Sequence, residues 1–178
     1  MSARPVIRPL TAVDVALYRP LRLAALAEAP QAFGASHADE APRSDEMIAR
    51  RLGGGADNCV FGAFADADLI GTAGFVIPDR SAKSRHKGML VGVYTAPAHR
   101  GGGIARALVE AVIEHARKHV LLLQAAVGAD NRPARRLYEA LGFRQYGLEE
   151  KALFVDGVYV DEALLVLDVS GRSVVRTP

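Results

Sequence analysis

The sequence has 178 residues, of which 50% are hydrophobic and 24% charged, an ordinary composition for a soluble globular protein of one domain. Its formal net charge of +2 is too small to indicate a nucleic-acid or anionic-membrane partner. The single cysteine, Cys59, excludes an internal disulfide and a cysteine-rich zinc site. The sequence shows no secretory or membrane-length apolar run, so we expect a cytoplasmic protein that binds neither nucleic acid nor membrane.

The first segment predicts a strand followed by a helix. Residues 6–8 favour β-structure and stop at Pro9, which indicates an edge strand. Residues 11–27 predict a helix in which Thr11 and Asp14 form a start like a capping box. Pro20 should kink or split this helix, because proline removes one backbone hydrogen bond and clashes with the preceding turn. The residues expected on its apolar face are Val13, Leu17, Leu21 and Ala24.

The next two segments combine loops with a short helix. Residues 30–42 lack a regular period and predict a loop or a broken helix. Ser44 is a good N-cap for a helix that carries Met47, Ile48 and Leu52 and stops at the glycines 53–55. These glycines follow a helix instead of preceding one, so we predict a mobile turn there and no phosphate site.

Two strands of a hairpin are predicted at residues 59–65 and 69–77, joined by a short turn at 66–68. The loop 78–87 that follows is polar and basic. A cluster of this kind is usually solvated, and contact with an anionic ligand is the alternative. Its basic residues are Arg80, Lys83, Arg85, His86 and Lys87.

The centre of the chain is a strand, a glycine turn and a helix. Residues 89–95 predict a buried strand that leaves the sheet before Pro97. Glycines at 101, 102 and 103 then open a helix whose apolar residues recur at helical spacing. The N–H groups of a first helical turn attract anions, and glycine has no side chain to hold an anion away. This order predicts an anion site, with a plain flexible turn as the alternative.

The last third predicts a strand, a helix and a hairpin. Residues 120–127 form a nearly continuous apolar run, which predicts an interior strand covered on both faces and parallel to strand 89–95. Asp130 or Asn131 caps a helix that ends before Gly142, with Leu137 and Leu141 facing the core and Ala134 and Tyr138 on an adjacent face. Asp156-Gly157 predicts a tight turn between strands 149–155 and 158–167. We expect the tail 169–178 to be disordered or loosely packed.

Two of these segments resemble a known family. The pattern Arg100-x-x-Gly103-x-Ala105 resembles the acetyl-coenzyme A signature of the GCN5-related N-acetyltransferases, the GNAT family. The run from Asn131 to Phe143 is similar to the Asn-x-x-Ala-x-x-Leu-Tyr-x-x-x-Gly-Phe segment that follows the fifth strand of these enzymes. The resemblance covers most of residues 4–168, and we expect residues 1–168 to form a single domain. It implies an α+β fold with a mixed, mostly antiparallel seven-stranded sheet, about four flanking helices, and a splay between strands 4 and 5.

The resemblance also implies the residues of a site. Tyr138 is implied to protonate the departing thiolate, and a backbone N–H near Tyr94, at a bulge, is implied to stabilise the tetrahedral intermediate. Phe33 and Tyr94 are expected to contact the acceptor, near residues 32–34 and 154–159. Three roles have alternatives: Tyr138 as a packing residue, Asn131 as only a helix cap, and Phe33 as a core anchor. The implied acetyl-coenzyme A contacts are Val93, Tyr94, Thr95, Arg100, Gly101, Gly102, Gly103, Ile104, Ala105, Arg106, Asn131, Ala134 and Tyr138.

The sequence departs from the family pattern at the base. Many members carry a glutamate on the fourth strand, but residues 89–95 contain no carboxylate, and Thr95 replaces a common valine. Deprotonation of the acceptor could pass through water to His37, Glu40 or His86. The implied activity is transfer of an acetyl group to a primary amine of a small molecule or peptide by direct attack, without a metal. A non-catalytic acyl-coenzyme A sensor is the alternative, and the sequence leaves the acceptor and a homodimer open.

Overall fold

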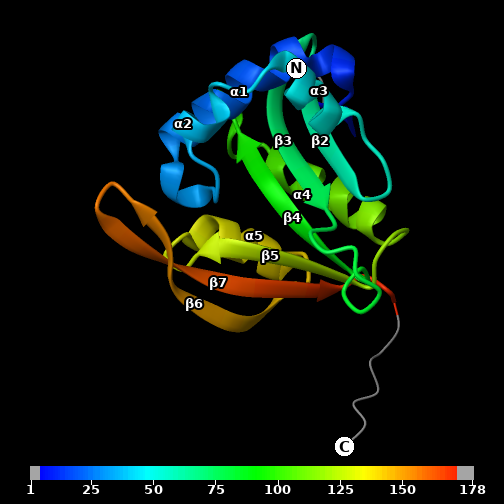
Figure 1. Ribbon diagram of the computed structural model, residues 1–178, viewed down its shortest axis with the longest axis vertical. Coiled ribbons are helices and arrows are strands. Elements are labelled where there is room, and N and C mark those ends of the chain that lie inside the picture. The colour runs from blue at the N-terminus through cyan, green and yellow to red at the C-terminus, as the bar shows by residue number, and fades with distance from the viewer. Residues whose placement is uncertain (1–4, 172–178) are drawn as a thin grey trace, which may run out of the picture.

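The computed structural model describes residues 5–171, in which seven strands form one sheet in the order β1-β2-β3-β4-β5-β7-β6 (Figure 1). The strands are β1 (Val6–Pro9), β2 (Asn58–Ala65), β3 (Asp68–Val76), β4 (Lys87–Thr95), β5 (Leu122–Gly128), β6 (Arg144–Val155) and β7 (Val158–Asp168). The α-helices are α1 (Val15–Glu28), α2 (His37–Glu40), α3 (Asp45–Leu52), α4 (Ile104–Ala116) and α5 (Arg132–Ala140). Three short 3₁₀ turns are η1 (Ala12–Asp14), η2 (Pro30–Ala32) and η3 (Pro97–His99).

The sheet is opened in the middle. Strands β1 to β4 pair antiparallel, as do β5 with β7 and β7 with β6. The one parallel pair, β4 with β5, joins only Lys87–Met89 to Leu122–Gln124. Beyond these residues the two strands diverge, so the sheet has the shape of a V in Figure 1. The predicted fold class and the splay between strands 4 and 5 are confirmed.

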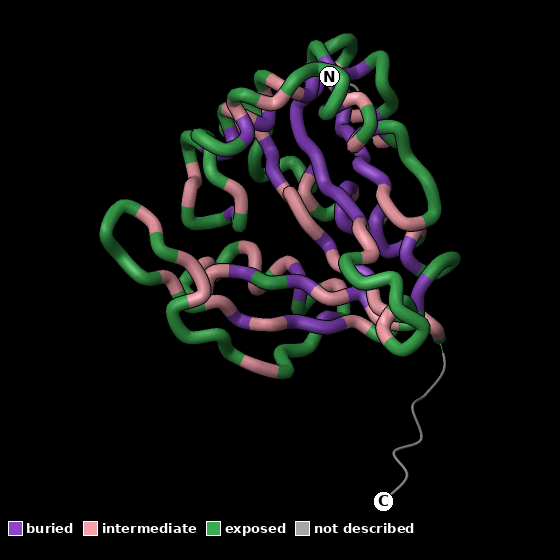
Figure 2. The backbone as a smooth tube through the Cα atoms, in the orientation of Figure 1, coloured by how far each residue is buried: buried purple, intermediate pink, exposed green. Residues whose placement is uncertain are grey.

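Helices cover the sheet on both faces. In Figure 1, α4 and α5 lie behind the strands, and the main core lies beneath them. Leu108, Val109 and Val112 of α4 are fully buried there, together with Phe75 and Leu123 of the sheet. A second hydrophobic cluster lies under α1 and α3 on the other face of the sheet. Figure 2 shows that the buried segments of the backbone follow the strands between the two helical layers. No helix in residues 5–171 is long and apolar enough to cross a membrane.

The first helix differs from its prediction. It is one continuous helix through Pro20, which is exposed. Val13 and Leu17, expected on the buried face, are 87% and 40% exposed, whereas Tyr18 and Arg22 are buried. The prediction was wrong because Arg22 is buried by its ion pair with Glu40, a partner on another element that helical periodicity cannot reveal.

Strand β5 also differs from its prediction. Leu123, Ala125 and Val127 are buried, but Ala126 between them is exposed. Only the face toward α4 is therefore fully covered, because α1 and α3 pack on β3 and β2 and do not extend over β5. An apolar run alone could not distinguish these two situations.

Most local signals are confirmed. The Ser44 hydroxyl accepts a hydrogen bond from the Met47 amide at 3.3 Å, as expected of an N-cap, and residues 30–42 form a broken helix made of η2 and α2. Strand β6 begins at residue 144, five residues earlier than predicted. The tail prediction was wrong at Val169, which is buried and donates its N–H to the carbonyl of Leu121 at 3.0 Å. Residues 172–178 of the predicted tail lie outside the described residues.

Candidate active site

The glycine loop presents an open helix N-terminus. Gly101 and Gly103 have φ angles of 81° and 77°, which only glycine adopts readily, and Gly103 is the N-cap of α4. All three glycines are exposed, and a Cβ on Gly101 or Gly103 would find no atom within 4 Å. The N–H groups at the start of α4 therefore face open space with the positive end of the helix dipole behind them. This geometry has the form of the predicted anion site.

Arg100 connects this loop to two other elements. Its Nε donates to the carbonyl of Thr95 at 3.0 Å, and its Nη2 lies 2.7 Å from Oε1 of Glu28 at the end of α1. The guanidinium also lies 5.7 Å from the centre of the Tyr94 ring. Arg100 therefore fixes the loop against β4 and α1, a role that the sequence pattern did not predict.

Glu28 is a site residue that the sequence analysis missed. The Tyr94 hydroxyl donates to Oε2 of Glu28 at 2.6 Å. This hydrogen bond and those from Arg100 lower the pKa of Glu28, and burial together with Glu28 raises the pKa of Tyr94 to about 12. Glu28 and Tyr94 are 66 positions apart, so no local pattern could have connected them.

Strand β4 carries the predicted bulge. Its register against β3 shifts between the pairs Thr72↔Tyr94 and Gly74↔Val91, and Gly92 has a φ of 62°. After the bulge, Val93 packs against the main core, whereas Tyr94 packs on the opposite face with residues of α1. The Thr95 hydroxyl is buried, with no hydrogen-bond partner in the described part of the chain. The end of β4 thus holds a buried polar group without a partner.

Helix α5 places the second motif near the first. The side chain of Asn131 accepts from the Ala134 amide at 3.2 Å, which confirms its N-cap geometry. Tyr138 is 7% exposed, and its ring lies 5.6 Å from that of Phe143 within the core shared with α4. Burial raises the pKa of Tyr138 to about 12, so its hydroxyl stays protonated at neutral pH.

The three candidate bases of the sequence analysis lie in unfavourable places. Glu40 is buried between Arg22 and Arg51, with charged contacts of 3.3 and 3.0 Å. Burial alone would raise the pKa of Glu40, but the two arginines outweigh it and lower the pKa. His37 is exposed at the first turn of α2, and His86 immediately precedes β4, at the end opposite Tyr94.

Phe33 is a packing residue at the edge of this region. It is 8% exposed and packs with Ala25, Leu26 and Tyr94. The Arg22 guanidinium lies 5.0 Å from the centre of its ring. Phe33 therefore anchors the loop after α1, and any contact with an acceptor would be made by the small exposed remainder of its ring.

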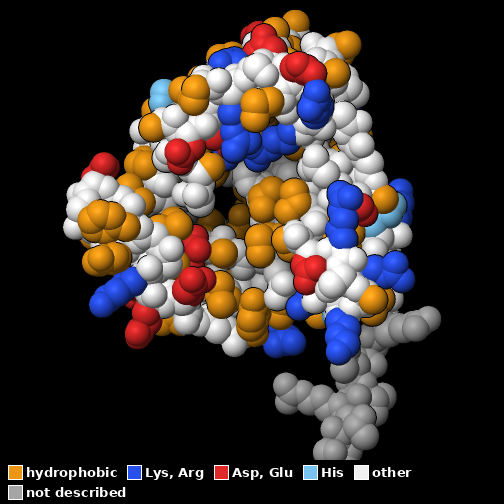
Figure 3. All heavy atoms as spheres, in the orientation of Figure 1, with side chains coloured by type: hydrophobic (Ala, Val, Ile, Leu, Met, Phe, Trp, Pro, Cys, Tyr) orange, Lys and Arg blue, Asp and Glu red, His pale blue; other side chains and the backbone are white. Residues whose placement is uncertain are grey.

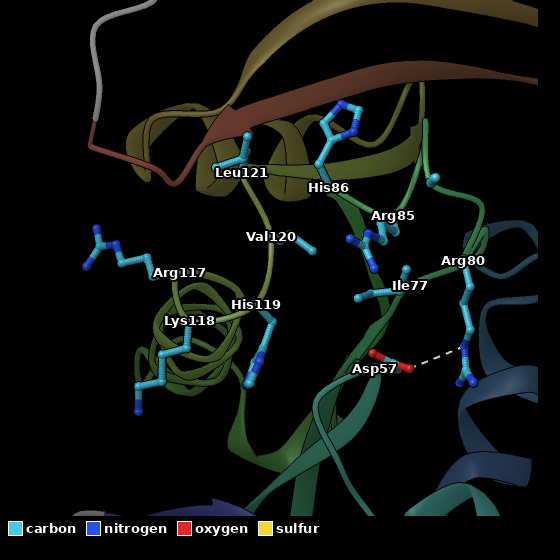
Figure 4. A pocket seen from close by; sticks show the side chains of 11 residues that line it. Asp57, Ile77, Arg80, Arg85, His86, Arg117, Lys118, His119, Val120 and Leu121 are labelled. Atoms are coloured by element: carbon cyan, nitrogen blue, oxygen red, sulfur yellow. Dashed lines mark ion pairs between the residues drawn. The ribbon is translucent and has the colours of Figure 1, made fainter.

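The basic loop 78–87 does not lie at the glycine loop. Arg80, Arg85 and His86 line an open depression of about 720 Å³ together with Arg117 and His119, just beyond the C-terminal end of α4. Arg117 and Lys118 point away from the depression in Figure 4, and Arg80 is 3.3 Å from Asp57. A helix of 13 residues, about 20 Å long, separates this loop from the start of α4, so the loop does not contact an anion bound there. Contact of the loop with the 3′-phosphate of a coenzyme or with an acidic acceptor stays a prediction.

The other arm of the V carries an exposed hairpin. Phe154, Val158 and Tyr159 are 65%, 63% and 59% exposed near the turn between β6 and β7. η2 lies against β5 and β6, so the loop after α1 reaches across the opening. Figure 3 shows a hollow between the two arms with acidic side chains beside it. Within residues 5–171 no group of three or more His, Cys, Asp or Glu is placed to hold a metal ion.

Comparison with known proteins identifies the class of this fold and site. The model of the acetyltransferase (GNAT) family matches residues 23–143, so the chain belongs to this family.

Two curated relatives and one solved structure show the extent of the similarity. The chain is 33% identical over 100 residues to the N-alpha-acetyltransferase RimI of Mycobacterium tuberculosis, covering 56% of this chain and 61% of that protein. It is 41% identical over 96 residues to N-alpha-acetyltransferase 40 of Saccharomyces cerevisiae, covering 49% of this chain and 34% of that protein. The structure of yncA from Salmonella typhimurium, solved with its cofactor acetyl-CoA, has a TM-score of 0.81 and 22% identity, covering 99% of this chain and 98% of that one. The chain thus spans less than two thirds of the length of either curated relative.

Proposed function

We propose that this protein transfers an acetyl group from acetyl-CoA to a primary amine by direct attack, in the cytoplasm. The observation that carries the proposal is the coincidence of two features at one place. The open N-terminus of α4 follows directly from the strand whose divergence from β5 opens the sheet. An anion site at the N-terminus of α4 and an open edge of β4 together suit an extended cofactor that ends in phosphates. Family membership supports the same activity.

The residues present fit such a cofactor. The N–H groups of residues 101–106 would hold the pyrophosphate, and Val93, Tyr94 and Thr95 would face its extended arm along β4. The buried, unpaired hydroxyl of Thr95 supports this placement, because a buried hydroxyl without a partner is costly unless a ligand satisfies it. Asn131, Ala134 and Tyr138 would border the arm from α5. When bound, acetyl-CoA supplies an activated thioester carbonyl.

Within this site the protein would lower two barriers. A backbone N–H exposed by the bulge next to Tyr94 would stabilise the negative oxygen of the tetrahedral intermediate. The Tyr138 hydroxyl would give its proton to the thiolate as the carbon–sulfur bond breaks. The raised pKa of Tyr138 keeps its hydroxyl protonated at neutral pH. The buried surroundings that raise this pKa would also disfavour the charged thiolate of the coenzyme, so proton transfer from Tyr138 to the thiolate would be favoured.

We further propose that the acceptor is the α-amine of a peptide or protein. An α-amine has a pKa of about 7.7–8.0, so freeing it at pH 7 costs roughly 1 kcal/mol, against about 4.6 kcal/mol for a lysine amine. The lower cost suits a site whose fourth strand carries no carboxylate. Both curated relatives are named N-alpha-acetyltransferases, and the exposed apolar hairpin of β6 and β7 offers a surface for a peptide.

The test is thiol release from acetyl-CoA with matched acceptors. Each peptide is supplied with a free α-amine, and again with its α-amine blocked but with an internal lysine; small-molecule amines form a third set. We expect free α-amine peptides to turn over at least tenfold faster than blocked ones, with the acetyl group located by mass spectrometry. Tight acetyl-CoA binding with no thiol release for any acceptor would instead support the alternative, a non-catalytic acyl-coenzyme A sensor.

A further inference from the structure

Glu162 of β7 lies at the open end of the V, on the arm formed by β5, β6 and β7. The register pairs it with Gly128, the last residue of β5, on one side. On the other side it pairs with Glu149 of β6. The register of β6 shifts directly after Glu149, which re-aims the strand at this point.

The side chain of Glu162 lies on the acceptor side of the sheet. Its neighbours Ala163 and Leu165 are buried in the main core with α4, and alternate residues of a strand project to opposite faces. Glu162 therefore projects to the face on which Tyr94 packs against α1. η2 lies against β5 and β6 on this arm, and Figure 3 shows acidic side chains over β6 and β7 beside the hollow.

No cation neutralises Glu162 within residues 5–171. Glu162 is half-buried, and its side-chain carboxylate makes no ion pair or hydrogen bond there. Burial and the facing Glu149 raise its pKa. The nearby charged groups are otherwise engaged: Asp161 accepts the Lys151 amide at 2.8 Å, and the Lys151 ammonium lies 5.7 Å from the centre of the Tyr159 ring. η2 carries no charged side chain.

We propose that Glu162 is the general base that accepts the proton of the acceptor amine, with Glu149 as a positioning residue that attracts the ammonium to it. This inference rests on the proposed function. In the step, the ammonium N–H bond breaks and its proton moves to the Glu162 carboxylate. The freed nitrogen pair forms the bond to the thioester carbonyl carbon. The carbon–sulfur bond then breaks as the thiolate takes a proton from another acid, and the second proton that the nitrogen loses on becoming an amide restores that acid. Glu162 then releases its proton to solvent.

The test compares Glu162→Gln with wild type on a free α-amine peptide. We expect kcat/KM to fall at least tenfold at pH 7 and less than threefold at pH 9, because the amine is already free at the higher pH. The loss should be larger for a lysine-like acceptor. Glu150→Gln removes the same charge from an exposed neighbour on β6 and should leave kcat/KM unchanged. Glu162→Asp should recover part of the loss.

Binding and folding controls separate this role from others. Acetyl-CoA affinity by calorimetry should not change in Glu162→Gln. The pKa of Glu162 is higher in the folded protein than in the unfolded chain. Ionised Glu162 therefore destabilises the fold above that pKa. Glu162→Gln, which carries no charge, should be at least as stable as wild type at pH 8. A raised KM with unchanged kcat, or a wild-type pH profile, would overturn the base role. A wild type that binds acetyl-CoA but acetylates no amine would overturn the proposed function itself.

Discussion

Replacing Gly103 with aspartate should separate coenzyme binding from folding. Gly103 has a φ of 77°, so a side chain there costs about 1–2 kcal/mol of backbone strain. A Cβ would meet no atom within 4 Å, and aspartate is better than glycine as an N-cap by only a few tenths of a kcal/mol, so the variant should lose about 1–2 kcal/mol of stability and still fold. Two unit charges about 5 Å apart repel by roughly 3 kcal/mol at an effective dielectric constant near 20, and salt reduces this. We therefore expect at least a tenfold loss of coenzyme A affinity.

The assay is isothermal calorimetry with coenzyme A on three variants. Gly103→Asn has nearly the same shape without the charge and should bind more tightly than Gly103→Asp. Gly54→Asp makes the same change at another glycine with positive φ, in the turn after α3, and should leave affinity unchanged. If Gly103→Asp is folded and binds coenzyme A as tightly as wild type, the pyrophosphate does not lie on this helix start.

Three other outcomes are expected. Tyr138→Phe should lower kcat by roughly 10²–10⁴-fold with less than a threefold change in coenzyme affinity, and a wild-type rate with chemistry limiting would make Tyr138 a packing residue. Single changes of His37 and His86 to alanine should leave kcat within about threefold, and a thousandfold loss in either would identify a dedicated base there. Asp14→Asn should destabilise the protein by about 1–2 kcal/mol at pH 7 in urea titrations, because Arg8 and the Thr11 amide lower the pKa of Asp14 to about 2. A carboxyl with a lowered pKa stabilises the fold above its unfolded pKa, so the difference from wild type should shrink below about pH 4 and vanish near pH 2; a difference that stays constant to pH 2 would refute this account.

Local signals in the sequence predicted the parts of the site that are built from neighbouring residues. The glycine loop, the N-cap at Asn131 and the turn at Asp156-Gly157 all formed as expected, because each depends on backbone geometry within a few positions. The same holds for the bulge of β4, which the family resemblance implied.

Residues whose roles depend on distant partners could not be predicted. Arg22 is buried because Glu40 pairs with it across 18 positions. Glu28 joins the site through Tyr94 and Arg100, which lie far along the chain. Glu162 acquires its surroundings only when β7 inserts between β5 and β6. In each case the deciding contact is tertiary, and no periodicity or short motif records it.

The position of β7 has a consequence for how the chain is made. The last strand is not at the edge of the sheet: it pairs with β5 on one side and with β6 on the other. During synthesis from the N-terminus, β5 and β6 cannot complete their hydrogen bonding until residue 168 has left the ribosome. Until then both strands present unpaired backbone edges, which are templates for association with other chains. Chains stopped before residue 158 should therefore aggregate during translation, whereas chains released after residue 171 should not.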